Sequence, residues 1–353
     1  MTTYKIAVIA GDGIGREVVP PTIEVLEAAG KKFGIGFEFR PFDWSADHYF
    51  KHGRMMPADA LDQLRPHDAI LLGAVGHVDL PDNLTLNGLL LPIRRGFDQY
   101  ANVRPAVLFE GVDSPLRNRA AGDIDMVVVR ENTEGEYAQI GGFLYHKQPG
   151  EVAVQTSVFT RRGCERVIRH AFELARKRNK KKRVASITKS NAQGYSMVLW
   201  DRAFQAVAEE FPDIETESLL VDAAAMNFVR RPHTFDVVVA SNLFGDILSD
   251  LSAIVAGSIG LAASANLDPE RRYPSMFEPV HGTAPDILGK GIANPMAAMF
   301  SASMMLDHLG QAAAAGAVEG ALAKALASGE AKSPDLGGKA TTRQVTDRVL
   351  SAL

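Results

Sequence analysis

Short apolar segments rich in β-branched residues recur along this chain and alternate with amphipathic stretches. Five of them are typical of buried strands, namely residues 4–10, 68–74, 123–131, 182–189 and 235–242. The stretch from Arg16 to Ala29, which follows the first of them, has the pattern of an amphipathic helix. This alternation predicts an α/β fold with a largely parallel sheet and helices on both faces.

Two regions depart from this alternation. Residues 150–160, GEVAVQTSVFT, alternate apolar and polar side chains, which predicts an antiparallel strand with one exposed face. The preceding residues, 141–150, could form a hairpin arm with it. Residues 296–330 are rich in Ala and Met at helical spacing, and a last helix is expected over 342–350, capped by a threonine near its start. Because no Pro- or Ser-rich linker divides the chain, we expect interwoven domains.

Length and composition limit the class of protein. A chain of 353 residues is long enough for about two domains. Its net charge of −4 gives no general attraction to nucleic acid or to anionic membranes. One cysteine, Cys164, excludes an intrachain disulfide and suits a reducing compartment, and the N-terminus has the pattern of neither a signal peptide nor an anchor. We therefore expect a cytoplasmic enzyme with no nucleic-acid or membrane partner.

A run of basic residues at 176–183, RKRNKKKR, has two interpretations. It could bind nucleic acid, or it could be a solvated helix end whose cations complement the helix dipole. Because the chain is acidic overall and no aromatic residues interleave with the cations, we favour the helix end.

The glycine-rich turn in VIAGDGIGREVV, residues 8–19, resembles the start of a dinucleotide-binding Rossmann fold. That fingerprint requires three glycines, and Arg16 stands at the third position. Pro20 and Pro21 follow within the next helical turn, where the dinucleotide-binding helix would not accommodate them. Glu38 is more simply a solvent-facing strand residue than a ribose-binding acid. We therefore reject the Rossmann interpretation.

A pair of aspartates carries the strongest local signal, in ASNLFGDILSDLSAIVAGSIGL at residues 240–261. The pattern predicts a strand ending at Asn242 and a helix starting near Asp246. Asp246 and Asp250 would then lie on one face of its first turns. One interpretation is a helix cap beside a solvated acid. The other is a divalent metal held by two carboxylates, with positions left for a substrate.

Several further side chains suit an active site at the ends of parallel strands. Arg94, Arg95, Arg104 and Arg130 could bind carboxylates in bidentate fashion if they converge, although any single arginine is more often a surface ion pair. Lys189 lies at the end of a predicted strand, where burial could make it a base. Tyr137 could equally be a core or interface residue. The loop 277–298, rich in Gly, Pro and Asn, could enclose a planar base.

Together these stretches resemble the β-decarboxylating dehydrogenases, which include the isocitrate and isopropylmalate dehydrogenases. NLFGDILSDLSA with GSIG, and then HGTAPDILGKGIANP, occur in the family's order. The resemblance implies an isocitrate/isopropylmalate dehydrogenase-like fold, distinct from the Rossmann fold, with two interwoven α/β domains and a mostly parallel central sheet. The cofactor domain would comprise residues 1–100 plus 256–353. Residues 101–255 would form the substrate and dimerisation domain, with a clasp arm near 140–160.

The resemblance also implies a homodimer whose active sites are shared between the subunits. Tyr137 matches the family's general acid, and Lys189, contributed by the other subunit, matches its base. The family's Mg²⁺ or Mn²⁺ ligands correspond to Asp246 and Asp250, with Asp222 from the other subunit. The implied substrate-binding residues are Asn87, Leu90, Arg94, Arg104 and Arg130.

Cofactor choice follows from the same resemblance. Asp286 stands where NADP-using isocitrate dehydrogenases carry lysine. An aspartate there would accept hydrogen bonds from the adenosine hydroxyls and repel a 2′-phosphate, which predicts NAD. The implied cofactor-binding residues are Ile14, Glu278, His281, Gly282, Thr283, Ala284, Asp286, Ile287 and Asn294, with Asp12 nearby. A monovalent cation such as K⁺ is a further candidate cofactor.

The substrate is expected from the stretch VVRENTEGEYAQIGG, which is most similar to the family's tartrate and D-malate dehydrogenases. This implies oxidation of a 2-hydroxy diacid followed by β-decarboxylation. Asn87 departs from those enzymes, which usually carry tryptophan there, and Leu90 and Leu91 match leucines that hold an isopropyl group. 3-Isopropylmalate dehydrogenase is therefore the alternative. A catalytically inactive nucleotide-binding scaffold of the same fold is the alternative from another class.

Overall fold

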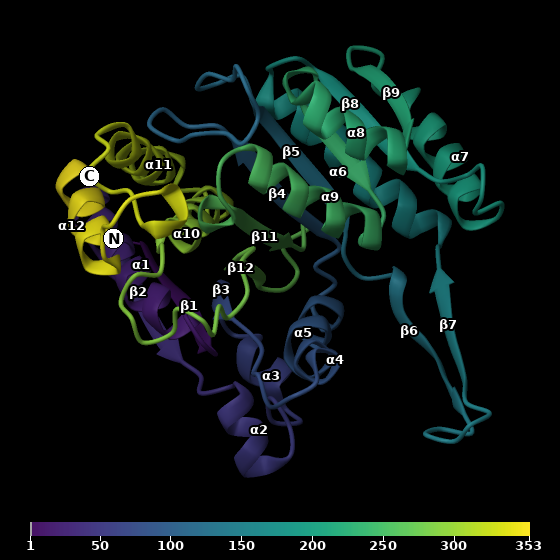
Figure 1. Ribbon diagram of the computed structural model, residues 1–353, viewed down its shortest axis with the longest axis horizontal. Helices are drawn as coiled ribbons and strands as arrows, with labels where there is room; N and C mark the ends of the chain where they lie inside the picture. Colours follow the sequence, from purple (N-terminus) through teal and green to yellow (C-terminus); the bar gives the residue numbers. More distant parts are fainter. Residues whose placement is uncertain (1) are drawn as a thin grey trace.

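One ten-stranded sheet runs through the whole molecule (Figure 1). The structure is a computed structural model and describes residues 2–353. In order across the sheet, the strands are β2 (Ile35–Pro41), β1 (Thr2–Gly11), β3 (Ala69–Ala74), β12 (Ser275–Pro279), β11 (Ala263–Leu267), β4 (Ala101–Val107), β5 (Asp125–Glu131), β10 (Val237–Ala240), β8 (Arg183–Thr188) and β9 (Glu215–Leu220).

Parallel pairing predominates in this sheet. Six of the nine pairings are parallel, and the antiparallel ones are the three that join β12, β11, β4 and β5 in sequence across the middle. The prediction of a mostly parallel sheet is confirmed. In this sheet β3, from the first part of the chain, lies beside β12 and β11, from its last part. Segments from the two parts are therefore neighbours in the sheet.

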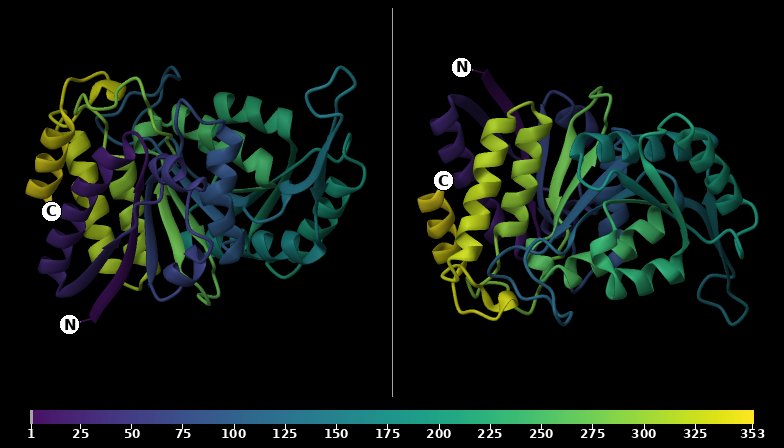
Figure 2. Two further views of the ribbon diagram at one scale, coloured as in Figure 1. Left: turned by 90° about the horizontal axis from the view of Figure 1, so that it is seen from below. Right: turned by 90° about the horizontal axis from the view of Figure 1, so that it is seen from above.

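Helices cover both faces of the sheet (Figure 2). The strands formed by the two ends of the chain are accompanied by four helices, namely α1 (Gly15–Phe33), α10 (Met296–His308), α11 (Ala312–Ala327) and α12 (Thr342–Ala352). The strands formed by the middle of the chain are accompanied by four others, namely α6 (Arg161–Arg178), α7 (Ser196–Ala208), α8 (Val221–Arg230) and α9 (Asn242–Val255). The shorter helices are α2 (Ala46–His52), α3 (Ala60–Leu64), α4 (Asp82–Thr85) and α5 (Leu91–Gly96), with a π-helical turn at Leu86–Leu90 between the last two. None of the helices within residues 2–353 is long and apolar enough to cross a membrane.

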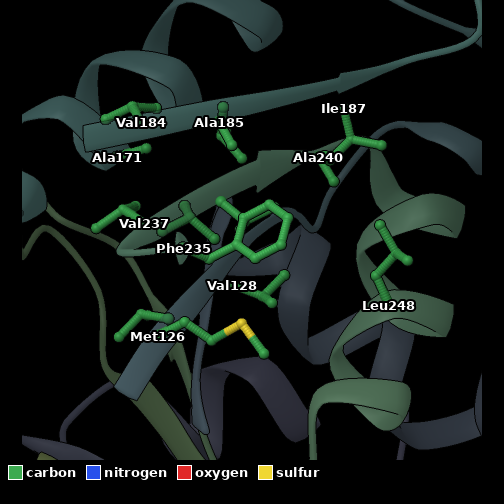
Figure 3. Packing of buried hydrophobic residues seen from close by; sticks show 14 of the residues in the cluster. Met126, Val128, Ala171, Val184, Ala185, Ile187, Phe235, Val237, Ala240 and Leu248 are labelled. Carbon is green, nitrogen blue, oxygen red and sulfur yellow. The ribbon is translucent and has the colours of Figure 1, made fainter. Parts of the chain in front are cut away.

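The buried core divides into packing units. One large cluster contains only residues between Tyr100 and Ala256, with Phe235 among strands β5, β8 and β10 (Figure 3). A second cluster joins residues near the N-terminus, such as Ile6, with residues of the last helices, such as Val349. We propose these units as the two predicted domains, 101–255 and 1–100 plus 256–353.

The basic run at 176–183 ends helix α6. Asn179 adopts a left-handed conformation, with φ of 49°, and stops the helix. Arg176 pairs with Asp213, while Arg178 and Lys180 both pair with Asp125. These local ion pairs agree with the interpretation of the run as a helix end.

The strands β6 (Gly135–Leu144) and β7 (Val152–Val158) form a separate antiparallel arm that extends away from the body (Figure 1). The predicted hairpin is confirmed. The prediction that 150–160 has only one exposed face is wrong, because residues 152–157 are all exposed. No other element of the described chain packs against the arm's far end, which leaves uncovered Ile140, Phe143, Leu144, Tyr145, Val152 and Val154.

Candidate active site

A cleft lies where the terminal and central packing units meet. It is lined by the ends of β3 and β12 with the loops that follow them, by the π-helical turn, and by side chains from α5, β4, β5, β6 and α9. The lining residues are Gly73, Ala74, Val75, Leu86, Leu90, Leu91, Arg94, Arg104, Arg130, Tyr137, Asp246, Glu278, Pro279, Val280, His281 and Gly282. Most substrate-binding residues expected from the sequence are thus brought together in one place.

Two arginines and an aspartate form the charged centre of this cleft. Arg130 Nη1 lies 2.5 Å from Oδ1 of Asp246, and Arg104 Nη1 lies 3.2 Å from the same oxygen. Burial lowers the pKa of Arg130 to about 10, against the effect of Asp246, so this side chain stays charged at neutral pH. Burial acts to raise the pKa of Asp246, but Arg130 and Arg104 outweigh it and hold that pKa below its ordinary value. The centre therefore has two fixed cations around one ionised carboxylate.

Helix α9 begins earlier than expected from the sequence. It starts at Asn242 rather than near Asp246, because Glu136 of β6 accepts hydrogen bonds from the Ser241 hydroxyl, at 2.8 Å, and from the Leu243 N–H, at 3.1 Å. Asp246 is therefore not a helix cap, and its carboxylate is free to face the cleft. Gly245 permits the close approach, since a Cβ there would lie 2.6 Å from Cβ of Arg130.

Tyr137 reaches the same aspartate from the arm. Its hydroxyl donates to Oδ2 of Asp246 over 2.9 Å, and the Arg130 guanidinium lies 5.3 Å from the centre of its ring. Burial, with Asp246 adding to it, raises the pKa of Tyr137. The phenol therefore keeps its proton at neutral pH and can serve as an acid.

Arg94, a further arginine of the cleft lining, is held by a separate ion pair. Its Nη2 lies 2.6 Å from Oε1 of Glu278, and both side chains are buried. The amide of Asn266 donates to the same oxygen over 2.8 Å. Nε of Arg94 is buried without a partner among the described residues, as is Nε of Arg104. Each of these two arginines therefore has one buried N–H group that the described residues leave without an acceptor.

The residues expected to bind a divalent metal are divided between two places. Asp246 and Asp250 are one turn apart on α9, and Arg104 Nη1 lies 3.2 Å from one carboxylate and 3.3 Å from the other. Asp222 instead pairs with Lys189 over 2.7 Å, and neither residue lines the cleft. Within residues 2–353, no three His, Cys, Asp or Glu side chains are grouped closely enough to hold a metal. The Asp246 and Asp250 carboxylates would supply two oxygen ligands, which fits part of a site for Mg²⁺ or Mn²⁺.

The loop after β12 packs against the glycine-rich turn after β1. The Ile14 N–H donates to the Thr283 carbonyl over 3.0 Å, and a Cβ at Gly13 would lie 2.2 Å from that oxygen. Nε2 of His281 is buried without a partner in the described chain, and burial lowers the pKa of this imidazole. A neutral, unsatisfied ring nitrogen in a glycine-lined loop fits the expected nucleotide. Glycine at 13 is required by loop packing rather than by a phosphate.

Three residues near this loop differ in how they are held. Asp286 is exposed. Asn294 donates to Asp335 over 3.1 Å, and Asp335 also accepts from Ser258 over 2.6 Å. Asp12, expected beside the cofactor, uses its carboxylate to accept the N–H groups of Ala46 and Gly76 and is therefore occupied within the protein. Asp335 was not expected from the sequence, where it is one polar residue in a polar loop.

The predicted substrate-binding residues Asn87 and Leu90 lie differently. Leu90 lines the cleft. Asn87 donates to the Asn83 carbonyl over 2.6 Å, and its Oδ1 accepts from Gln139. Asn87, Gln139 and the second partner of Gln139, Arg95, are not among the lining residues, but Arg95 donates to the carbonyl of Tyr137, which is one of them. Sequence reasoning missed Gln139, and it considered Arg95 only as one of several arginines.

Comparison with known proteins agrees with this geometry. The model of the isocitrate/isopropylmalate dehydrogenase family matches residues 5–349. The tartrate dehydrogenase/decarboxylase of Pseudomonas putida is 51% identical over 351 aligned residues, covering 97% of this chain and 96% of that protein. The D-malate dehydrogenase (decarboxylating) of Escherichia coli strain K12 is 51% identical over 356 aligned residues, covering 99% and 98%.

The fold is also similar to that of a solved enzyme. The crystal structure of isocitrate dehydrogenase from Methylococcus capsulatus has a TM-score of 0.89 at 36% identity and covers 99% of both chains. These similarities confirm the resemblance and the fold class predicted from the sequence. The chain is an oxidoreductase and belongs to the isocitrate/isopropylmalate dehydrogenase family.

Proposed function

We propose that the protein oxidises D-malate or tartrate with NAD and a divalent metal, and that it decarboxylates the oxidised intermediate. The observation that carries the proposal is the convergence of Arg104, Arg130 and Tyr137 on Asp246 in one cleft. Similarity over nearly the full chain to a tartrate dehydrogenase/decarboxylase and a D-malate dehydrogenase supports the choice of substrate.

The three cleft arginines bind the two carboxylates of the diacid. Guanidinium groups suit this task because they donate in a planar fork that matches a carboxylate. Arg94 and Arg104 each retain a buried donor without a partner in the described chain. Leu90, together with Leu86 and Leu91, borders the part of the cleft that receives the substituent on C3.

Asp246 and Asp250, completed by Asp222 of a second copy, would hold the Mg²⁺ or Mn²⁺. The loop 281–287, with Ile14, Glu278 and Asn294, would hold NAD, and the exposed Asp286 carboxylate would favour it over NADP. When bound, the metal supplies a Lewis acid for the C2 oxygen, and the nicotinamide accepts the hydride from C2.

Two side chains move the protons. Lys189 of a second copy accepts the proton of the C2 hydroxyl as hydride leaves C2. The resulting keto acid has a carboxylate β to its ketone, so the bond to that carboxylate can break with release of CO₂ and leave its electron pair in the enolate. Tyr137 then donates its hydroxyl proton to C3. The raised pKa of Tyr137 suits this step, because the residue must hold its proton until then.

This function requires a homodimer. Lys189 and Asp222 pair with one another away from the cleft, so a site that contains them and Tyr137 must combine two copies. The arm offers a surface for that contact, because its apolar side chains have no cover within the described chain.

A panel of substrates tests the proposal. The purified protein would be assayed for NADH and CO₂ formation with Mn²⁺ and D-malate, L-tartrate, meso-tartrate or 3-isopropylmalate, and then with NADP in place of NAD. We expect the highest kcat/KM for D-malate or a tartrate, with NAD. A preference for NADP would contradict the cofactor assignment.

The apolar lining from Leu86, Leu90 and Leu91 favours one second candidate, 3-isopropylmalate dehydrogenase. A kcat/KM for 3-isopropylmalate far above that for D-malate would establish it. Absence of activity with every diacid, while NAD still binds, would instead support the inactive nucleotide-binding scaffold.

A further inference from the structure

A chain of hydrogen bonds connects the helical segment 82–96 to the backbone of Tyr137. Asn87 donates to the Asn83 carbonyl over 2.6 Å and accepts from Nε2 of Gln139. Oε1 of Gln139 accepts from Nη1 of Arg95, and Nη2 of Arg95 donates to the main-chain carbonyl of Tyr137. The two groups that accept hydrogen bonds from Arg95, the Gln139 side-chain carbonyl and the Tyr137 main-chain carbonyl, are both uncharged.

Tyr137 lies where the arm's own pairing is interrupted. The register of β6 against β7 shifts between Gly135 and Ile140, so residues 136–139 have no paired residue in β7. Gln139, within that interval, has a φ of 54° and turns its side chain out of the regular strand pattern. The strand ladder therefore does not hold the Tyr137 backbone, and Arg95 supplies a donor to it from another element.

The two adjacent arginines of α5 contact different parts of the molecule. Arg94 lines the cleft and pairs with Glu278. Arg95 does not line the cleft and contacts the arm instead. Asn87 lies in the π-helical turn Leu86–Leu90, which directly precedes the helix α5 that carries both arginines. Such turns interrupt a helix and are frequent at functional sites.

We propose that Arg95 and Gln139 are positioning residues for Tyr137, and that Asn87 anchors them to the segment that carries Arg94. The inference rests on the proposed function, in which Tyr137 is the proton donor. Through this link, the helix that binds the substrate carboxylate also sets the position of the acid. Tyr137 is then held at two points, by Asp246 at its side-chain hydroxyl and by Arg95 at its main-chain carbonyl.

The main test is an Arg95→Met variant compared with wild type. We expect kcat for NADH and CO₂ formation to fall by about tenfold to a hundredfold, because small displacements of a reacting group have effects of this size. The KM for the diacid should change by less than about threefold, because the three cleft arginines are unaltered. Arg95→Lys should recover little, because a single ammonium cannot reproduce the planar two-acceptor contact. Gln139→Ala should show a smaller fall in kcat of the same kind.

A double-mutant cycle separates positioning from other roles. In a Tyr137→Phe background, the residual rate should change by less than about twofold on adding Arg95→Met, since the group to be positioned is already absent. If the two losses multiply, or if Arg95→Met raises the KM strongly, Arg95 acts on the substrate directly and the proposal is overturned. It is also overturned if Arg95→Met has wild-type kcat.

Matched controls cover folding and assay failure. Arg348→Met on α12 and Gln63→Ala on α3 remove the same side chains at partly exposed positions outside the arm and α5, and they should leave kcat unchanged. Circular dichroism and thermal unfolding check that Arg95→Met is folded. If it is not, Gln139→Ala and Asn87→Ala carry the test. Wild-type inactivity with every 2-hydroxy diacid would refute the proposed function itself, whereas an active wild type with unaffected variants would refute only the positioning role.

Discussion

The cleft centre and the Lys189–Asp222 pair differ in almost every physical respect, although both are proposed to serve one reaction. Arg104 and Arg130 are buried, and each contacts Asp246 inside a cleft made by one chain. The side chains of Lys189 and Asp222 are partly or largely exposed, and their charged groups pair with each other. The hydrogen bond from Lys189 is what lowers the pKa of Asp222.

In the proposed homodimer, the two sets of residues would form one site although they lie apart in a single chain. In the buried half, two guanidinium groups and the Asp246 carboxylate are already held together by contacts within one chain. In the exposed half, an ammonium and a carboxylate neutralise one another at the surface, where such a pair contributes little to stability. The two halves should therefore respond differently to mutation.

The largest effect is expected from Asp246→Asn. It removes the carboxylate that meets both arginines and Tyr137, so kcat/KM should fall by about 10³-fold or more. Unfolding should also occur at a lower temperature, because two buried guanidinium groups lose their counter-charge. Steady-state kinetics and thermal unfolding measure both effects.

The matched control is Asp222→Asn in the exposed half. It should reduce activity and leave the unfolding temperature of the separate subunit nearly unchanged. Equal losses of stability in the two variants would remove the distinction between the halves.

The second effect concerns Lys189→Met. Loss of a general base should lower kcat by about 10²- to 10⁴-fold. Unfolding and refolding this variant together with Asp246→Asn should restore activity, because a mixed dimer has one site with both intact residues. If the mixture stays as inactive as its components, the site is not shared between copies.

A third, smaller effect is expected at the arm. Replacing Phe143 and Leu144 by serine removes apolar surface without touching the cleft. Association should weaken by about tenfold or more, since the loss of roughly 1.4 kcal/mol already produces such a change. Analytical ultracentrifugation would show monomers, and specific activity would fall on dilution. A variant that remains dimeric at nanomolar concentration would exclude the arm from the interface.

The last effect is a pH dependence of stability at Glu131, a buried residue at the end of β5 next to Arg130. Burial raises the pKa of Glu131 from 4.5 to about 7. The native state then binds a proton more tightly than the unfolded chain, so stability falls as pH rises from about 4.5 to about 7. Glu131→Gln should flatten the unfolding temperature between pH 5 and pH 7.5. An unchanged slope would mean that Glu131 is ionised throughout.

Much of this organisation could be predicted from local patterns. The apolar runs became β1, β3, β5, β8 and β10, and the threonine cap of the last helix is present as a capping box between Thr341 and Gln344. Such features depend on residues close in sequence. The four-residue spacing of Asp246 and Asp250 likewise predicted that both lie on one face of the helix.

What could not be predicted depends on contacts between distant segments. Glu136 extends α9 toward its N-terminus from more than a hundred residues away, and no pattern around Ser241 signals it. Gln139 joins Arg95 only because the arm's register shifts. The wrong expectation of one exposed face on the arm has a similar cause. Alternating apolar and polar residues predict a strand, but they do not show whether another part of the chain covers its apolar face.

The order of strands across the sheet has a consequence for protein synthesis. Strands β4, β5, β10, β8 and β9 are neighbours and all lie between Ala101 and Ala240, so this unit can assemble as soon as it leaves the ribosome. β3 was made earlier, yet it lacks its partner β12 until about 200 residues later, a delay on the order of 10–40 s at roughly 5–20 residues per second. Its open edge needs protection during that time. The strand β3 is therefore translated before the unit 101–240 but completes its pairing after it.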